Sequence, residues 1–190
     1  PAMSNSLMVL DSLGFKRDHP DRVIVRASIE KLLVKKGEVS YCQPCLSPVW
    51  DTGLGFHALL ESGLAANASE LTQAGQWLID RQILDVKGDW AVKNPDLRPG
   101  GWAFQYKNDY YPDVDDTAVV VMALHRADPE IYKNAIDRGA EWILGMQSSN
   151  GGWGAFDINN EHYHLLHIPF ADHGALLDPP TADVSARCLG

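Results

Sequence analysis

Hydrophobic residues recur at spacings of three and four positions along most of this chain, which is the period of an amphipathic α-helix. In the first third, the pattern predicts helices over residues 6–13, 20–36 and 51–60, and a loop over residues 37–48. Each predicted helix is followed by a glycine suited to end it: Gly14, Gly37 and Gly63. The alternation of polar and apolar residues that marks a strand is nearly absent.

Further helices are predicted in the rest of the chain. They begin near Ser69, Asp113, Asp128 and Pro180, and the first of them includes Gln82. We therefore expect an all-α protein, built from helix–loop–helix hairpins that stack on one another.

A repeated pattern of glycine, tryptophan and glutamine lies on two of these helices. Its first copy is Gly75, Trp77, Gln82, Gly88 and Trp90, and its second copy is Gly139, Trp142, Gln147, Gly151 and Trp153. A glutamine amide at a helix C-terminus can bond free carbonyl groups and the N–H groups of the next helix, while an indole shields these bonds from water. The repeat therefore predicts a structural clasp between successive helix pairs.

Length and charge narrow the class of function. The chain has 190 residues, 45% of them hydrophobic, and a formal net charge of −9, which argues against a nucleic-acid partner. No apolar run approaches the roughly 18 residues that span a bilayer, and contact with a membrane surface stays open. The chain starts at Pro1 inside an apolar periodic stretch and stops inside a predicted helix at Gly190, so we expect it to be truncated at both ends.

Two groups of residues have the composition of metal ligands. Cys42 and Cys45 form a Cys-x-x-Cys pair without a second pair, which favours two reduced cysteines in a loop of a cytosolic protein. A second segment is rich in histidine and holds Glu161, His162, His164, His167 and His173. This segment lacks the paired helical spacing of zinc peptidases, so we expect no metal site there.

Three carboxylates, Asp113, Asp115 and Asp116, fall within four residues at the predicted start of a helix. Aspartate at this place is typical of helix capping, because its oxygen accepts free backbone N–H groups. Carboxylates this close also raise one another's proton affinity, so that one of them can keep a proton near neutral pH and serve as an acid. The local sequence leaves both interpretations open.

With the repeat beside it, the acid segment makes the chain resemble the triterpene cyclases, and most closely the squalene–hopene cyclases, over essentially all of its length. The repeat matches the QW motif of that family. Further matching segments are residues 47–52, 88–93, 100–105, 145–154, 167–170 and 178–180.

The resemblance implies a fold of two α/α barrels made of helical hairpins, of which this chain holds a part. Residues 1–46 would end one barrel and form a linker, and residues 47–190 would begin the second, catalytic barrel. It also implies a bacterial, monotopic protein at the cytoplasmic face of the cell membrane, with a homodimer as an open alternative.

The implied reaction is protonation of a terminal alkene of squalene, followed by ring closure through carbocations to pentacyclic hopanoids. By this resemblance Asp115 is the proton donor, while Asp113 and Asp116 hold and polarise it. No cofactor is implied. We expect the 190 residues by themselves to be inactive, because half of the cavity wall would be missing.

Aromatic side chains are the implied lining of the cavity, because aromatic faces stabilise cations without acting as bases. Trp50, Phe104 and Phe156 match lining positions, and the last of these is often tyrosine in the family. The alternative for each is ordinary core packing. Phe170 and Ala171 would lie near the constriction of the channel through which the lipid enters.

Arg187 departs from the family, whose best-known members carry a histidine next to the catalytic acid. Asp183 and Arg187 should form a pair at i and i+4 on one helix face. A fixed positive charge near Asp115 would favour the ionised carboxylate, which makes a stronger acid that is less often protonated at rest.

Three other classes compete with this interpretation. A class II diterpene cyclase also uses a D-x-D-D acid, but the two repeat copies and residues 47–52 disfavour it. An oxidosqualene cyclase would carry an Asp-Cys-Thr-Ala type of acid motif, which is not present at residues 115–118. A non-catalytic helical scaffold would explain the repeat but not the acids.

Overall fold

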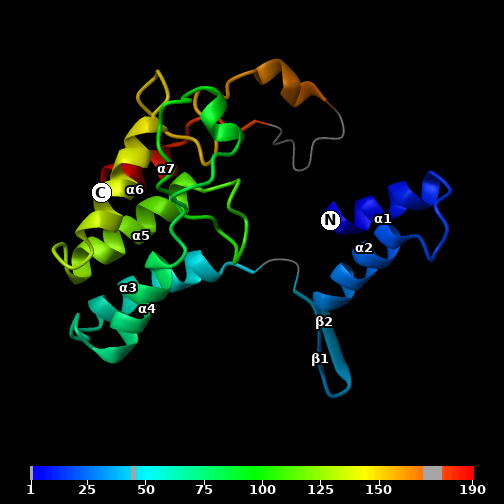
Figure 1. Cartoon of the computed structure of the whole chain (residues 1–190), viewed down its shortest axis with the longest axis horizontal. Helices are drawn as coiled ribbons and strands as arrows, with labels where there is room; N and C mark the ends of the chain where they lie inside the picture. The colour runs from blue at the N-terminus through cyan, green and yellow to red at the C-terminus, as the bar shows by residue number, and fades with distance from the viewer. Residues whose placement is uncertain (1, 44–45, 169–176) are drawn as a thin grey trace. The chain divides into compact units, whose positions relative to one another are not determined.

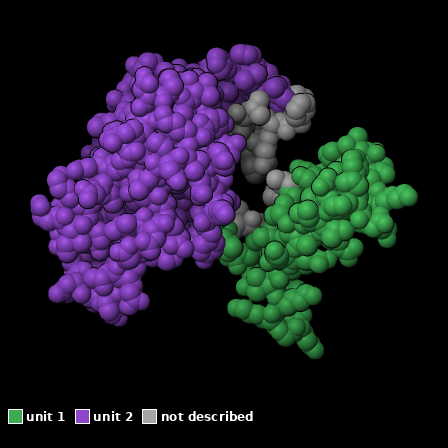
Figure 2. All heavy atoms as spheres, in the orientation of Figure 1, with its two compact units in different colours: residues 1–46 green, residues 47–190 purple. Residues whose placement is uncertain are grey.

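The computed structural model describes residues 2–43, 46–168 and 177–190 (Figure 1). The chain divides into two compact units, residues 1–46 and residues 47–190 (Figure 2). The assignment of these units to two different barrels stays a prediction.

The first unit is a helical hairpin followed by a β-hairpin. Helices α1 (Ala2–Ser12) and α2 (Pro20–Lys31) pack against each other. Strands β1 (Leu33–Lys36) and β2 (Val39–Cys42) then pair in antiparallel register, with Leu33 opposite Cys42 and Lys36 opposite Val39.

The β-hairpin corrects the sequence prediction at two places. The helix predicted over residues 20–36 ends at Lys31, and residues 39–42 form a strand where a loop was expected. The reason is the turn: Gly37 has φ of +61°, a conformation that reverses the chain and that ordinary residues avoid. Cys42 therefore lies in an exposed strand as a free thiol, and not in a loop, while Cys45 lies outside the described residues.

Helices are the main regular structure of the second unit, so the predicted helical class is confirmed, with the small hairpin of the first unit as an addition. Its helices are α3 (Pro48–Glu61), α4 (Ser69–Ile79), α5 (Val114–Ala127), α6 (Lys133–Gly145) and α7 (Ala182–Leu189), with short 3₁₀ turns η1 (Asp89–Val92) and η2 (Tyr163–His167). Helix α5 is central, because it packs against α3, α4, α6 and α7. Among the described residues, no helix has the length and apolar character needed to cross a membrane.

Several predicted helix ends are wrong by one turn. Helix α3 starts at Pro48, three residues before Asp51, because proline is well suited to the first turn of a helix. Helix α4 ends at Ile79, so Gln82 follows the helix and does not belong to it. Helix α6 starts at Lys133, because the Asp128 carboxylate first accepts the backbone N–H groups of two residues in a separate turn.

Two tryptophans hold the turns that start α5 and α7, and the two turns have the same bonds. Trp102 Nε1 donates to the Leu78 carbonyl at 2.7 Å, and Trp153 Nε1 donates to the Ile143 carbonyl at 2.7 Å. The backbone N–H of Trp102 donates to Thr117 Oγ1 at 2.9 Å. In the same way, that of Trp153 donates to Ser185 Oγ at 3.0 Å.

Each of the two hydroxyls also bonds the residue that caps its own helix. Thr117 Oγ1 donates to the Asp113 carbonyl, and Ser185 Oγ donates to the Thr181 carbonyl, both at 2.6 Å. We call the set of Trp102, Asp113 and Thr117 the α5 turn. The set of Trp153, Thr181 and Ser185 is the α7 turn.

This equivalence corrects the sequence repeat in its last member. The structural counterpart of Trp153 is Trp102, and not Trp90 as the spacing suggested. Trp90 instead packs edge-on against Trp142 in the core, with 5.7 Å between the ring centroids. The Gly-x-Trp spacing alone could not distinguish these two roles, because both tryptophans follow a glycine.

The glutamines of the repeat make different bonds. The Gln82 amide donates to the carbonyls of Gly100, at 2.8 Å, and of Ala135 in α6, at 2.9 Å. This bond pair ties the end of α4 to α6, as the clasp hypothesis predicts. The Gln147 amide bonds within its own turn, to the Gly151 carbonyl, so the clasp predicted for the second copy is not made by this glutamine in the part of the chain that the structure describes.

Candidate active site

Asp113 caps helix α5. Its backbone is extended, and its Oδ1 accepts the N–H groups of Asp115 at 2.8 Å and of Asp116 at 3.3 Å. Burial raises the pKa of Asp113 to about 6, and the negative charges of Asp115 and Asp178 add to this effect, while the two N–H bonds oppose it. The capping interpretation is therefore correct for Asp113.

Asp116 is the most deeply buried acid of the three, with 2% of its surface exposed. Its Oδ1 has no hydrogen-bond partner in the part of the chain that the structure describes. Burial, together with the charges of Asp113, Asp115 and Asp51, raises the pKa of Asp116 to about 8. Within this triplet, Asp116 is thus the group built to keep a proton near neutral pH.

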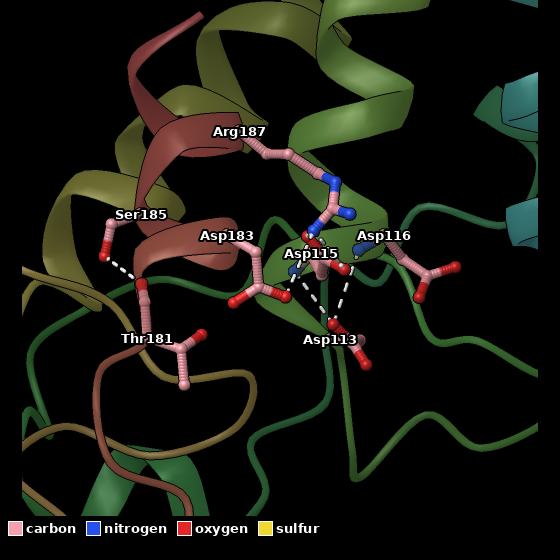
Figure 3. Close-up of polar contacts among 7 residues, drawn as sticks. All are labelled: Asp113, Asp115, Asp116, Thr181, Asp183, Ser185 and Arg187. Atoms are coloured by element: carbon pink, nitrogen blue, oxygen red, sulfur yellow. Dashed lines mark hydrogen bonds and ion pairs between the residues drawn. The ribbon is translucent and has the colours of Figure 1, made fainter.

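Asp115 points the other way, toward α7 (Figure 3). Nη1 of Arg187 lies 2.8 Å from its Oδ1 and 3.1 Å from its Oδ2. The same nitrogen lies 3.8 Å from Asp183 Oδ2, so the predicted pair at i and i+4 is present. Arg187 therefore connects α7 to the start of α5, with the Asp115 side chain still 21% exposed.

The three carboxyl groups do not converge. Figure 3 shows the carboxyls of Asp115 and Asp116 on different sides of the helix start, and the bonds within the triplet run from backbone N–H groups to Asp113. The helix begins at Val114, so Asp115 and Asp116 both lie in its first turn and are separated by about 100° around its axis.

The three predicted lining residues are not gathered around one groove of the described chain. Trp50 is partly buried in α3, and its ring lies 5.5 Å from the guanidinium carbon of Arg187. Phe104 is partly buried as well. Phe156 is 40% exposed and lines a groove of about 370 Å³ with Tyr111 and Leu177. Their role as a cavity lining stays a prediction.

Two further predictions concern the segment after α6. Phe170 and Ala171, the predicted channel residues, lie outside the described residues, as does His173. The rings of His162 and His164 meet edge-on at 6.0 Å between centroids. The described residues contain no group of three or more His, Cys, Asp or Glu side chains arranged to hold a metal ion.

Sequence reasoning missed the residues that brace the site. Thr117 and Ser185 are bonded into the two turns, and Asp178 accepts the N–H groups of Ala155 at 2.9 Å and Asp157 at 3.1 Å. A usable signal was present for the first two, because each is the fourth residue after a helix cap. No local signal identifies Asp178, since its partners are more than 20 residues away.

Comparison with known proteins decides the family. Residues 46–190 match the model of the squalene-hopene cyclase C-terminal domain. The chain belongs to the squalene–hopene cyclase family. Over its whole length it is 58% identical to the squalene–hopene cyclase of Zymomonas mobilis and 61% identical to the probable squalene–hopene cyclase of Sinorhizobium fredii. It is also 56% identical to that of the fungus Schizosaccharomyces japonicus.

All three alignments cover 100% of this chain and 30% of the relative. The chain therefore spans about a third of the length of the cyclases that it matches. The family expected from the QW motif and the acid segment is confirmed. A bacterial source stays a prediction, since similar cyclases occur in fungi as well.

Proposed function

We propose that this chain, as part of a cyclase of its relatives' length, supplies the acid that starts the cyclisation of squalene to pentacyclic hopanoids. Asp115 is the donor in this proposal. The observation that supports it most is the Asp115–Arg187 contact at 2.8 Å, placed beside two buried acids at the start of α5.

The contact suits the chemistry of alkene protonation. An alkene is a very weak base, so the transfer needs an acid whose conjugate base is stabilised as the proton leaves. The proton passes from Asp115 to a terminal alkene carbon, the π electrons form the new C–H bond, and a tertiary carbocation results. The guanidinium of Arg187 stabilises the carboxylate that forms, with charge-assisted bonds to both of its oxygens.

Asp116 helps by staying largely neutral near pH 7, because its pKa is raised to about 8. With pKa values raised to about 6 and about 8, Asp113 and Asp116 carry less negative charge at neutral pH than ordinary aspartates. As a result, less negative charge repels the carboxylate that forms on Asp115 when the proton leaves. Asp113 also fixes the backbone of the two other acids through its cap bonds.

The decisive experiment is Asp115→Asn in the full-length cyclase, with squalene as substrate and the products measured by gas chromatography. We expect turnover to fall by at least about 10²–10⁴-fold, the usual contribution of a general acid. Asp137→Asn is the matched control, because Asp137 is an exposed acid on α6 that pairs only with a neighbouring lysine in the described chain. Turnover close to wild type in Asp115→Asn would contradict the proposal.

We also propose that the full-length protein works at the cytoplasmic face of the cell membrane, because squalene is insoluble in water and has to be taken from a bilayer. A lipid-vesicle flotation experiment tests this, with the protein expected in the floating fraction. Recovery of all the protein in the aqueous fraction would contradict it. That the protein forms homodimers stays a prediction, which sedimentation would test.

A further inference from the structure

Arg187, on α7, contacts side chains of two other helices. Trp50 comes from α3, Asp115 from α5, and Arg187 with Asp183 from α7. The guanidinium carbon lies 5.5 Å from the Trp50 ring centroid, within the range of a cation–π contact, while Nη1 bonds Asp115. An acid and an aromatic face from two other helices thus hold one arginine.

The arginine needs such a support. Its side chain is long and flexible, so a fixed position costs conformational entropy. Asp183 gives limited help, because its side chain is 70% exposed and lies 3.8 Å from Nη1, a geometry in which water screens the attraction. A guanidinium is planar and weakly hydrated, which lets it pack against an indole face without a large loss of hydration.

We propose that Trp50 is a positioning residue for the proton donor: its indole holds the Arg187 guanidinium against Asp115, and this role exists because the chain carries arginine at position 187. The proposal rests on the proposed function of Asp115. It assigns to Trp50 a role in the proton transfer that differs from lining a cavity for cations.

The two roles of Trp50 make different predictions. A lining residue acts on the substrate, so its loss has the same effect whatever residue occupies position 187. A residue that holds Arg187 loses its importance when the arginine is replaced by the smaller imidazole of histidine. A double-mutant cycle between positions 50 and 187 separates these cases.

The experiment uses the full-length cyclase with Trp50→Leu, Arg187→His and the double variant, with kcat and KM for squalene measured against pH. With Arg187 present, Trp50→Leu should lower kcat by about tenfold, with little change in KM. With histidine at position 187, the same change should lower kcat by less than about threefold.

Two controls keep the result interpretable. Phe104→Leu changes another predicted lining aromatic, and its effect should be equal in both backgrounds. Trp50→Phe keeps an aromatic face and should restore most of kcat. If circular dichroism shows that Arg187→His is unfolded, Arg187→Gln takes its place, since a neutral amide makes no cation–π contact with the indole.

Equal effects of Trp50→Leu in both backgrounds, or a rise in KM alone, would overturn the proposal. Either result would leave the role of Asp115 intact, which Asp115→Asn tests separately.

Discussion

The α5 turn and the α7 turn have the same backbone frame but differ in the side chains placed on it. In both, a tryptophan donates hydrogen bonds from its indole N–H and from its backbone N–H. In both, the acceptor of the backbone N–H is a hydroxyl four residues after the helix cap. The cap of the α5 turn is the buried Asp113, and that of the α7 turn is the exposed Thr181.

The next positions differ more. Asp115 corresponds to Asp183, and Asp116 corresponds to Val184, which is buried with 7% of its surface exposed. At this buried position the α7 turn carries an aliphatic side chain, whereas the α5 turn carries an acid with one oxygen that has no hydrogen-bond partner among the described residues. The comparison teaches that both turns share one frame, whereas an acid at the buried position that Val184 holds in the α7 turn is a feature of the α5 turn.

The largest predicted effect is the loss of stability on removal of either tryptophan, and it tests whether the two turns are equivalent. Trp102→Ala and Trp153→Ala should each lower the free energy of unfolding by about 3–5 kcal/mol, because each removes a buried ring and the hydrogen bond from its indole N–H to a carbonyl at a helix end. Chemical denaturation of the full-length variants measures both values. A loss below about 1 kcal/mol for only one of them would show that the frames differ.

The second prediction concerns the acid at the apolar position. The folded-state pKa of Asp116 is raised to about 8, so from about pH 4 to pH 8 the folded chain keeps a proton that the unfolded chain releases. The contribution of Asp116 to stability therefore decreases as the pH rises through this window. Asp116→Asn cannot ionise and should be more stable than wild type by on the order of 3 kcal/mol at pH 8, with little difference near pH 4.

Denaturation at several pH values measures this difference, and Asp137→Asn, an exposed acid, serves as the control with a flat profile. A stability difference that is independent of pH would contradict the raised pKa.

The smallest effect concerns the two hydroxyls. Thr117→Val should cost about 1–3 kcal/mol, because it leaves the Trp102 N–H buried without an acceptor. Ser185→Ala should cost about 1 kcal/mol, since Ser185 is only partly buried and water can replace its hydroxyl. Thermal unfolding of the two variants gives the order. A larger cost for Ser185→Ala would reverse our assignment of the more buried turn.

The helical class, the start of α5 and the family could all be predicted from the sequence, because each rests on local patterns. A cap such as Asp113 bonds N–H groups two and three residues away, and the pair of Asp183 with Arg187 spans a single helix turn. The β-hairpin was missed although it is local, because the hydrophobic run before Gly37 fits a helix and a strand equally well.

Other features depend on contacts between distant parts of the chain. Arg187 and Asp115 are 72 residues apart in the sequence. Only the equivalent hydrogen bonds of the two indoles show that Trp102 is the structural counterpart of Trp153. The proton affinity of Asp116 has the same origin, because burial among packed helices sets it more strongly than its neighbours in sequence do. The sequence by itself determined that three acids stand at the start of a helix. Only the tertiary structure decided that one caps the helix, one meets an arginine and one is buried, because desolvation and pairing depend on which elements pack around them.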